Sequence, residues 1–178
     1  MKKLLLSLVA ILAFNQLLAA QEERVAGRLF YAEAGGPGVI MSVNFDARFN
    51  SNERLGFGYR LGLGFSYGEV GGKLNQWGFY DYKRQTYYSV PVGLNYVFGK
   101  PDSEKTFEVG AGLTFLTHKV SLHYYNERKP GHVIGFLTFM YRIMPIDGGF
   151  SFRVGLTPII GTSGDLVPMG AISFGYVF

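Results

Sequence analysis

The sequence predicts an all-β fold, a transmembrane antiparallel up-and-down β-barrel of eight strands. Beyond residue 20 the apolar residues recur with a period of two, which is typical of strands with two unlike faces. Turn residues interrupt this alternation, and the connections they form alternate between short and long. The 25 glycines, 16 phenylalanines and 12 tyrosines also favour a small barrel, with aromatic residues outside and glycines where the interior is crowded.

The first 20 residues have the pattern of an export signal. Two lysines precede an apolar stretch over residues 4–14, and small residues follow up to Ala20. The apolar stretch is shorter than the ~20 residues that a membrane-spanning helix needs. We therefore expect a cleaved signal peptide over residues 1–20 and one barrel domain over residues 21–178, with a retained helical anchor as the alternative.

The alternation is clearest in residues 39–49 and 55–67. In the second segment seven apolar residues alternate with glycines and single polar residues, which suits a lipid-facing side and a crowded interior. Further strands are expected over residues 88–98, 106–117, 133–143, 149–157 and 167–178. Bacterial barrels have even strand numbers, so residues 28–34 supply the eighth strand before a glycine-rich turn. The alternative is one long, glycine-kinked strand over residues 28–49.

The lengths of the connections predict which end of the barrel faces which compartment. Short polar or Pro/Gly-bearing turns are expected at residues 50–54, 99–105 and 144–148. Longer connections are expected at residues 68–85, 118–132 and 158–168. In outer-membrane barrels the short turns are periplasmic and the long loops are extracellular.

The last strand and three internal stretches carry a resemblance. Tyr176 and Phe178 end the chain on one face of the final strand, and a terminal aromatic residue resembles the sorting signal of bacterial outer-membrane barrels. The stretches YAEAGGPGVIMSVNFDARF, YYSVPVGLNYVFG and FSFRVGLTPII resemble a largely uncharacterised outer-membrane barrel family. The chain after residue 20 resembles, in its pattern, the small eight-stranded barrels of the OmpX and OmpA type. This resemblance implies an integral protein of a Gram-negative outer membrane, inserted by the barrel-assembly machinery, and carries over no catalytic residue.

Several charged residues are predicted to face the lumen. An arginine on the lipid face at mid-bilayer would cost about 2–4 kcal/mol, so the strands should turn such residues inward. They are Asp46, Arg48, Arg60, Glu108, Arg142 and Arg153. Aligning Phe49 with Leu55 sets Asn44 opposite Arg60 and places Asp46 one diagonal step away. This register predicts an Arg60–Asp46 ion pair. The interior of eight strands is just wide enough for side chains, which favours a filled lumen over a gated polar path.

The long connection at residues 68–85 is rich in aromatic residues. Trp77, Phe79, Tyr80 and Tyr82 are interleaved with or followed by the charged residues Asp81, Lys83 and Arg84. We expect an interfacial girdle that contacts outer-membrane lipids, including the phosphates of lipopolysaccharide. The alternatives are a protruding sheet that offers its edges to an unknown surface partner, and plain strand extensions above the bilayer.

Composition argues against several function classes. The formal charge of +4 includes two lysines of the signal peptide, so the barrel is too weakly basic to suggest nucleic acid. The chain has no cysteine, and its three histidines lack metal-ligand spacing, so we expect no cofactor and no metal. We therefore predict a structural or surface-interaction protein that is not an enzyme. Two alternatives are a lipid-modifying enzyme, with Ser121 and His123 meeting at the rim, and a transporter of small hydrophobic molecules through an open apolar lumen.

Overall fold

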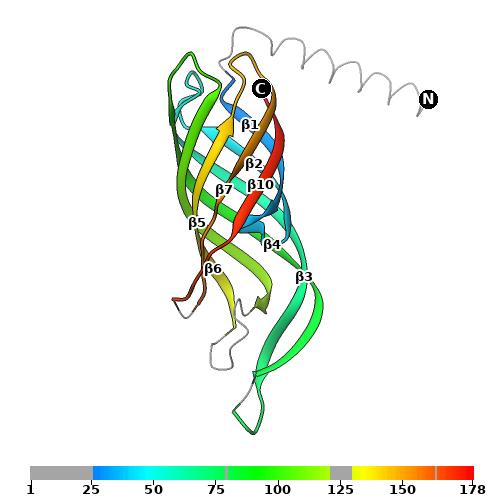
Figure 1. Cartoon of the computed structure of the whole chain (residues 1–178). Helices are drawn as coiled ribbons and strands as arrows, with labels where there is room; N and C mark the ends of the chain where they lie inside the picture. The colour runs from blue at the N-terminus through cyan, green and yellow to red at the C-terminus, as the bar shows by residue number, and fades with distance from the viewer. Residues whose placement is uncertain (1–25, 79, 121–129, 163) are drawn as a thin grey trace, which may run out of the picture.

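Eight antiparallel strands close into a barrel in the computed structural model, which describes residues 26–78, 80–120, 130–162 and 164–178 (Figure 1). The barrel strands are β1 (Arg28–Gly35), β2 (Met41–Arg48), β3 (Gly56–Leu74), β4 (Tyr80–Gly99), β5 (Lys105–Val120), β6 (Gly131–Ile143), β7 (Gly149–Leu156) and β10 (Gly170–Val177). Each pairs with its neighbour along the chain, and β1 pairs with β10 to close the ring. The predicted signal peptide lies outside the described residues.

The predicted fold class is confirmed, and so is a separate first strand. Residues Arg28–Ala34 pair antiparallel with Met41–Ala47, which excludes one continuous strand from residue 28 to 49. The reversal between them contains a 3₁₀ turn, η1 (Gly36–Gly38). Gly35 and Gly36 have φ angles of 75° and 71°, a region open to glycine, which explains why the chain can fold back here.

The structure extends two strands through a segment that we expected to be a loop. Strands β3 and β4 are 19 and 20 residues long, well beyond the ~9–11 residues that cross a bilayer. Their pairing continues from Phe65–Tyr88 to Leu74–Tyr80. Most of the connection predicted at residues 68–85 is therefore a paired hairpin, which projects from the barrel (Figure 1).

The connection predicted at residues 158–168 is also partly strand. Strands β8 (Ile159–Ile160) and β9 (Leu166–Val167) pair with each other, and β8 pairs with β6. They prolong β7 and β10 past interruptions at Pro158 and Pro168. Proline has no N–H to donate to the ladder, which accounts for the breaks.

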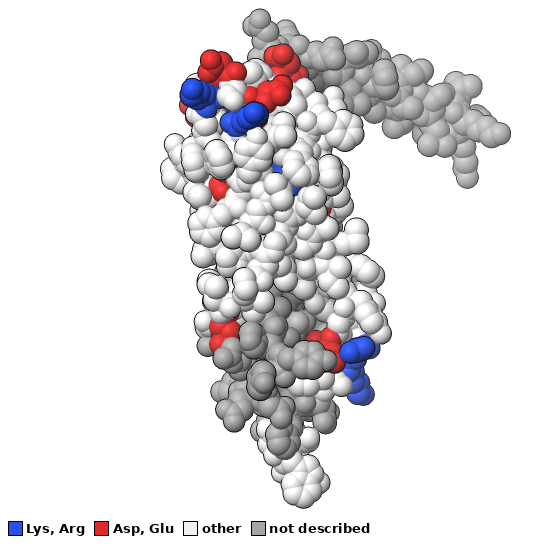
Figure 2. All heavy atoms as spheres, in the orientation of Figure 1, with Lys and Arg blue, Asp and Glu red and all other residues white. Residues whose placement is uncertain are grey.

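The outer wall of the barrel is apolar between its two ends. Charged side chains gather at the ends in the view of Figure 2, and the wall between them shows almost none. On β3 the outward residues from Phe57 to Tyr67 are all exposed large hydrophobics, a span of about one bilayer crossing. None of the helices within the described residues is long and apolar enough to span a membrane.

Glycine fills inward positions where a larger residue would collide with the lumen contents. A Cβ atom at Gly58 would lie 2.6 Å from Nη2 of Arg48, and one at Gly93 would lie 2.9 Å from Cζ of Phe136. Because an eight-stranded barrel has little interior volume, large inward side chains require a small residue beside them. The glycines of the predicted polar face therefore make room for the lumen residues.

Tryptophan fluorescence can locate the bilayer along β3. Trp77 is the only tryptophan and lies at the hairpin tip, roughly 30 Å of extended chain beyond Tyr67. We expect brominated acyl chains to quench a Leu63→Trp variant in a Trp77→Phe background, because residue 63 is 65% exposed on the apolar wall. Trp77 of the unmodified protein is the matched control and should not be quenched. Equal quenching of both would contradict the placement of the wall in the bilayer.

Candidate functional site

The lumen is the candidate functional site, and its polar belt contains all six predicted lumen residues. Asp46, Arg48, Arg60, Glu108, Arg142 and Arg153 are each at most 5% exposed. Arg142 bridges two acids, with Nη1 2.8 Å from Glu108 Oε2 and Nη2 3.4 Å from Asp46 Oδ1. Arg153 Nη2 lies 2.9 Å from both oxygens of Glu108. The structure thus places these residues in one ion-pair network.

Further members of this network were not predicted, among them Glu33 and Asn95. Glu33 of β1 is buried, and its Oε1 accepts a 2.8 Å hydrogen bond from Arg60 Nη2. Asn95 of β4 donates to Asp46 Oδ2 and accepts a 2.8 Å bond from Arg48 Nη2. Glu33 could have been found, because it alternates with Phe30 and Ala32 in the predicted first strand and a charge there should also turn inward.

The predicted Arg60–Asp46 ion pair is wrong. The turn between β2 and β3 takes two more residues than expected, with Phe49 N bonded to Phe57 O and Gly56 at φ 95°. This shift of two residues keeps each side chain on its face and sets Asp46 directly opposite Arg60. The Asp46 carboxylate nevertheless bonds Arg48 at 2.5 Å.

The partner of Arg60 lies on β1 instead. Besides Glu33, Arg60 Nη2 donates to Asn44 Oδ1 at 3.1 Å. Its guanidinium carbon lies 5.6 Å from the ring centroids of both Tyr31 and Phe136. These contacts direct the guanidinium group of Arg60 toward β1, away from the acid that faces it in the ladder.

The end of the barrel that carries the short turns, here the turn end, is closed by Arg54 and an apolar cluster. Arg54 donates to the carbonyls of Met144 at 2.5 Å, Pro101 at 3.0 Å and Ser103 at 2.6 Å. It therefore ties the three short turns together. Burial lowers the pKa of Arg54, and the Glu104 carboxylate opposes that shift. Beneath it a buried cluster contains Ala26, Leu29, Tyr31, Met144 and Val177.

The opposite end, here the loop end, is occupied by the turn η1. Its three residues are buried inside the barrel. Thr114 Oγ1 donates to Pro37 O at 2.8 Å, and the hydroxyls of Ser66 and Ser89 donate to Gly38 O at 3.2 and 3.1 Å. These bonds come from β3, β4 and β5, so the first reversal of the chain is held in the lumen by three strands.

Beyond η1 the lumen is apolar. A buried cluster there contains Val70, Tyr87, Leu116, Val120, Ile134 and Ile159, with Val39 and Met169 packed against it. Val70 of β3 also pairs with Val120 of β5, bypassing β4. The strands therefore approach one another at the loop end and narrow the mouth around this cluster.

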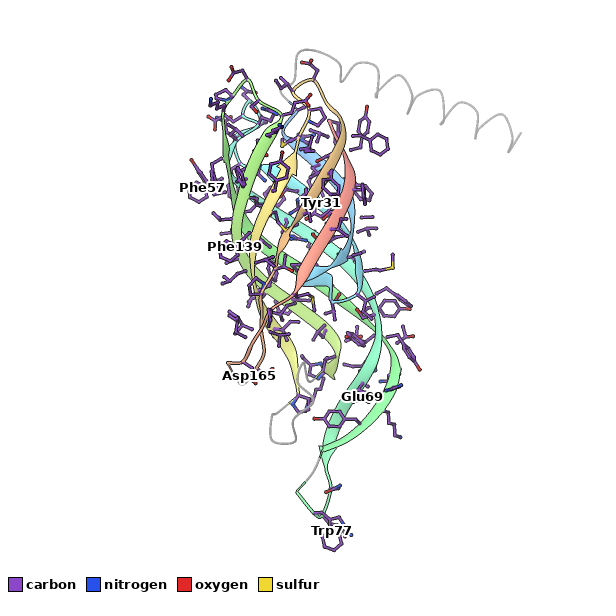
Figure 3. The ribbon with its side chains drawn as sticks, viewed as in Figure 1. Tyr31, Phe57, Glu69, Trp77, Phe139 and Asp165 are labelled. Carbon is purple, nitrogen blue, oxygen red and sulfur yellow. The ribbon has the colours of Figure 1, made fainter. Side chains whose placement is uncertain are left out.

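The structure places Trp77, one of the predicted interfacial aromatic residues, beyond the apolar wall. Trp77 is 75% exposed at the tip of the projecting hairpin, far beyond the wall (Figure 3). Its place in a girdle at the bilayer interface stays a prediction. Tyr82 is exposed on the hairpin between its tip and the barrel, opposite Gly71. Phe79 and the side chain of Tyr80 lie outside the described residues. Tyr67 and Tyr88 are exposed where the hairpin leaves the barrel.

The histidines do not form a recognisable reactive set in the described part of the chain. His118 contacts Thr117 Oγ1 at 3.2 Å, and His132 Nδ1 lies 3.1 Å from the carbonyl of Leu116. Ser121 and His123, the pair considered for an enzyme, lie outside the described residues. Within those residues no cluster of three or more potential metal ligands occurs.

Phe178 and Tyr176 lie at the seam where the barrel closes. Phe178 N donates to Arg28 O at 2.9 Å, and Arg28 N donates to Phe178 O at 3.2 Å. Both aromatic rings are exposed on the outer wall, and Phe178 lies 6.5 Å from the ring of Phe45. The residues of the predicted sorting signal are therefore also the last residues of the β1–β10 pairing.

Comparison with solved structures identifies the fold as that of a small outer-membrane barrel. The N-terminal β-barrel domain of Pseudomonas aeruginosa OprF matches over 88% of this chain and 100% of its own, with 12% identity and a TM-score of 0.54. The fold is that of the small eight-stranded outer-membrane barrels. The Ail protein of Yersinia pestis, crystallised with the heparin analogue sucrose octasulfate, matches over 85% of this chain and 92% of its own, with 14% identity and a TM-score of 0.36. No protein-family model and no curated protein sequence matches the chain.

A double-mutant cycle should distinguish the observed partner of Arg60 from the predicted one. We expect Glu33→Gln to destabilise the barrel by about 3–5 kcal/mol, because it leaves buried arginines without a counter-charge. Adding Arg60→Met should recover part of that loss. The control cycle combines Asp46→Asn with Arg60→Met and should show smaller coupling. Urea unfolding in lipid vesicles measures both cycles, and stronger coupling of Arg60 to Asp46 would contradict the pairing in the structure.

Proposed function

We propose that this protein is an integral outer-membrane barrel with a side-chain-filled lumen and a structural or surface-interaction role. The observation that supports this function is the occupation of the interior along its length. Arg54 and an apolar cluster fill the turn end, the ion-pair network fills the middle, and η1 with a second apolar cluster fills the loop end. An interior filled in this way stabilises the barrel and leaves little room for a solute to pass through the lumen.

The apolar wall supports the membrane location. A continuous belt of exposed large hydrophobics would be unstable in water and is stable against lipid. The export pattern of residues 1–20 and the terminal aromatic residue add the route: translocation, followed by insertion by the barrel-assembly machinery. We propose lipopolysaccharide as a lipid partner at the loop end, where Lys83 and Arg84 are exposed on the projecting hairpin.

A surface-attachment role is favoured by the same hairpin. It extends β3 and β4 beyond the wall and carries Trp77, 75% exposed, at its tip. Exposed tryptophan is enriched among residues that dominate binding energy in protein interfaces. The partner of such a hairpin would lie outside the cell.

The two alternative functions receive less support. A transporter of small hydrophobic molecules would need an open apolar path, whereas the arginines and carboxylates occupy the middle of the lumen. A lipid-modifying enzyme would need a nucleophile, a base and an acid that converge at the rim. His118 and His132 contact backbone or threonine oxygen atoms in the described residues, so neither is oriented by a carboxylate there.

Planar-bilayer recording tests the filled lumen. We expect no sustained single-channel openings, because water-filled pores need about 16–18 strands rather than eight. An assay for release of acyl chains from lipid A tests the enzyme alternative and should show none. Sustained openings would overturn the filled-lumen proposal. Acyl release that is lost in Ser121→Ala and His123→Ala variants would replace it with the enzyme.

Deleting Phe178 tests the proposed sorting signal. We expect a lower fraction of heat-modifiable, folded protein in outer membranes, because the insertion machinery would lose its terminal aromatic residue. Refolding of the same truncated protein in detergent separates this effect from loss of the two hydrogen bonds to Arg28. A Phe178→Tyr variant is the matched control. An undiminished folded fraction in cells, or an equal defect in detergent, would contradict the signal.

A further inference from the structure

The described part of the lumen contains more positive than negative charge. Four arginines face three carboxylates: Arg48, Arg60, Arg142 and Arg153 against Glu33, Asp46 and Glu108, all almost fully buried. A charge in a low-dielectric interior is costly unless a counter-charge lies beside it. Guanidinium groups stay protonated in proteins, so the excess charge cannot be lost by titration. The network therefore has one unbalanced positive charge.

The carboxylates are already fully engaged. Each of their six oxygen atoms accepts at least one hydrogen bond from a side chain. The donors are Arg60, Arg153 and Ser173 for Glu33; Arg48, Arg142 and Asn95 for Asp46; and Arg142, Arg153 and Thr138 for Glu108. The remaining donors of the arginines therefore face no free carboxylate in the network.

Several buried donors near Tyr31 lack a partner. They are Nε and Nη1 of Arg60, Nε of Arg153 and the hydroxyl of Tyr31. The guanidinium carbons of Arg60 and Arg153 lie 5.6 and 4.2 Å from the centroid of the Tyr31 ring. Each of these arginines also donates to one oxygen of Glu33, Arg60 to Oε1 and Arg153 to Oε2. Unsatisfied donors and two of the four arginines thus lie beside the ring of Tyr31 inside the barrel; Figure 3 labels Tyr31.

We propose that the barrel binds one small monovalent anion, of the chloride and bromide class, beside Arg60, Arg153 and Tyr31. One negative charge balances the network, whereas a sulfate or phosphate dianion would leave an excess of negative charge. A halide accepts from several donors at once and needs no acidic hydrogen of its own. The anion would act as a structural component of the lumen, independently of any surface role of the protein.

Crystals grown after refolding in sodium bromide test the site directly. We expect an anomalous difference peak within hydrogen-bonding distance of Arg60 Nη1 or Arg153 Nε. Refolding in bromide lets the ion enter before the barrel closes. Absence of a peak in the lumen, or peaks at the protein surface alone, would overturn the proposal.

Thermal unfolding provides a second test in solution. At fixed ionic strength, chloride should raise the temperature at which the folded form is lost relative to the bulky anion isethionate, and the effect should saturate. Tyr31→Phe keeps the charge but removes one donor, so it should need at least about tenfold more chloride for the same gain. Arg84→Met, at an exposed arginine, is the matched control and should respond like the unmodified protein. Equal stability in both salts, or an unchanged chloride dependence in Tyr31→Phe, would overturn the proposal.

Discussion

Every strand of the barrel contributes a side chain to one polar belt across the lumen, and the rest of the structure depends on this belt. The members are Glu33 from β1, Asp46 and Arg48 from β2, Arg60 from β3, Asn95 from β4, Glu108 from β5, Arg142 from β6, Arg153 from β7 and Ser173 from β10. Backbone ladders join each strand to its neighbours, apart from the single Val70–Val120 pairing of β3 with β5. The belt joins strands that are two places apart, such as β1 and β3 or β5 and β7, and Arg142 joins β6 to Asp46 on the opposite strand β2. It therefore opposes opening or flattening of the barrel.

Burying these charges is costly, and the geometry of the barrel explains how the cost is met. The lumen of eight strands is narrow, so carboxylates and guanidinium groups from opposite walls reach one another directly. Good geometry and several hydrogen bonds per carboxylate offset the desolvation of the pair. Glycines such as Gly58 leave the space that the long arginine side chains need. The same packing supports the proposal that the lumen is filled rather than a polar channel.

The two ends of the barrel are closed by different means. At the turn end Arg54 binds carbonyl groups of the other two short turns, so one side chain fixes three connections. At the loop end the turn η1 folds back into the lumen and is held by hydroxyl groups of three strands. Val39, which follows η1, has φ 78°, a conformation that is unfavourable for a β-branched residue and that the surrounding contacts must stabilise. Closure is thus built into the connections as well as into the strands.

The sequence by itself determined the fold class, the number of barrel strands and the inward face of six charged residues. These properties follow from the period of two, because a charge that faced lipid would cost more than any local preference could repay. Only the tertiary structure decided the register of the β2–β3 turn, the length of the projecting hairpin and the partners of each charge. A slip of two residues preserves both faces, so alternation cannot detect it. Arg60 bonds Glu33, two strands away on β1, rather than the facing Asp46, which is held by Arg48, Arg142 and Asn95. These choices depend on which side chains meet inside the lumen, and strand alternation carries no information about that.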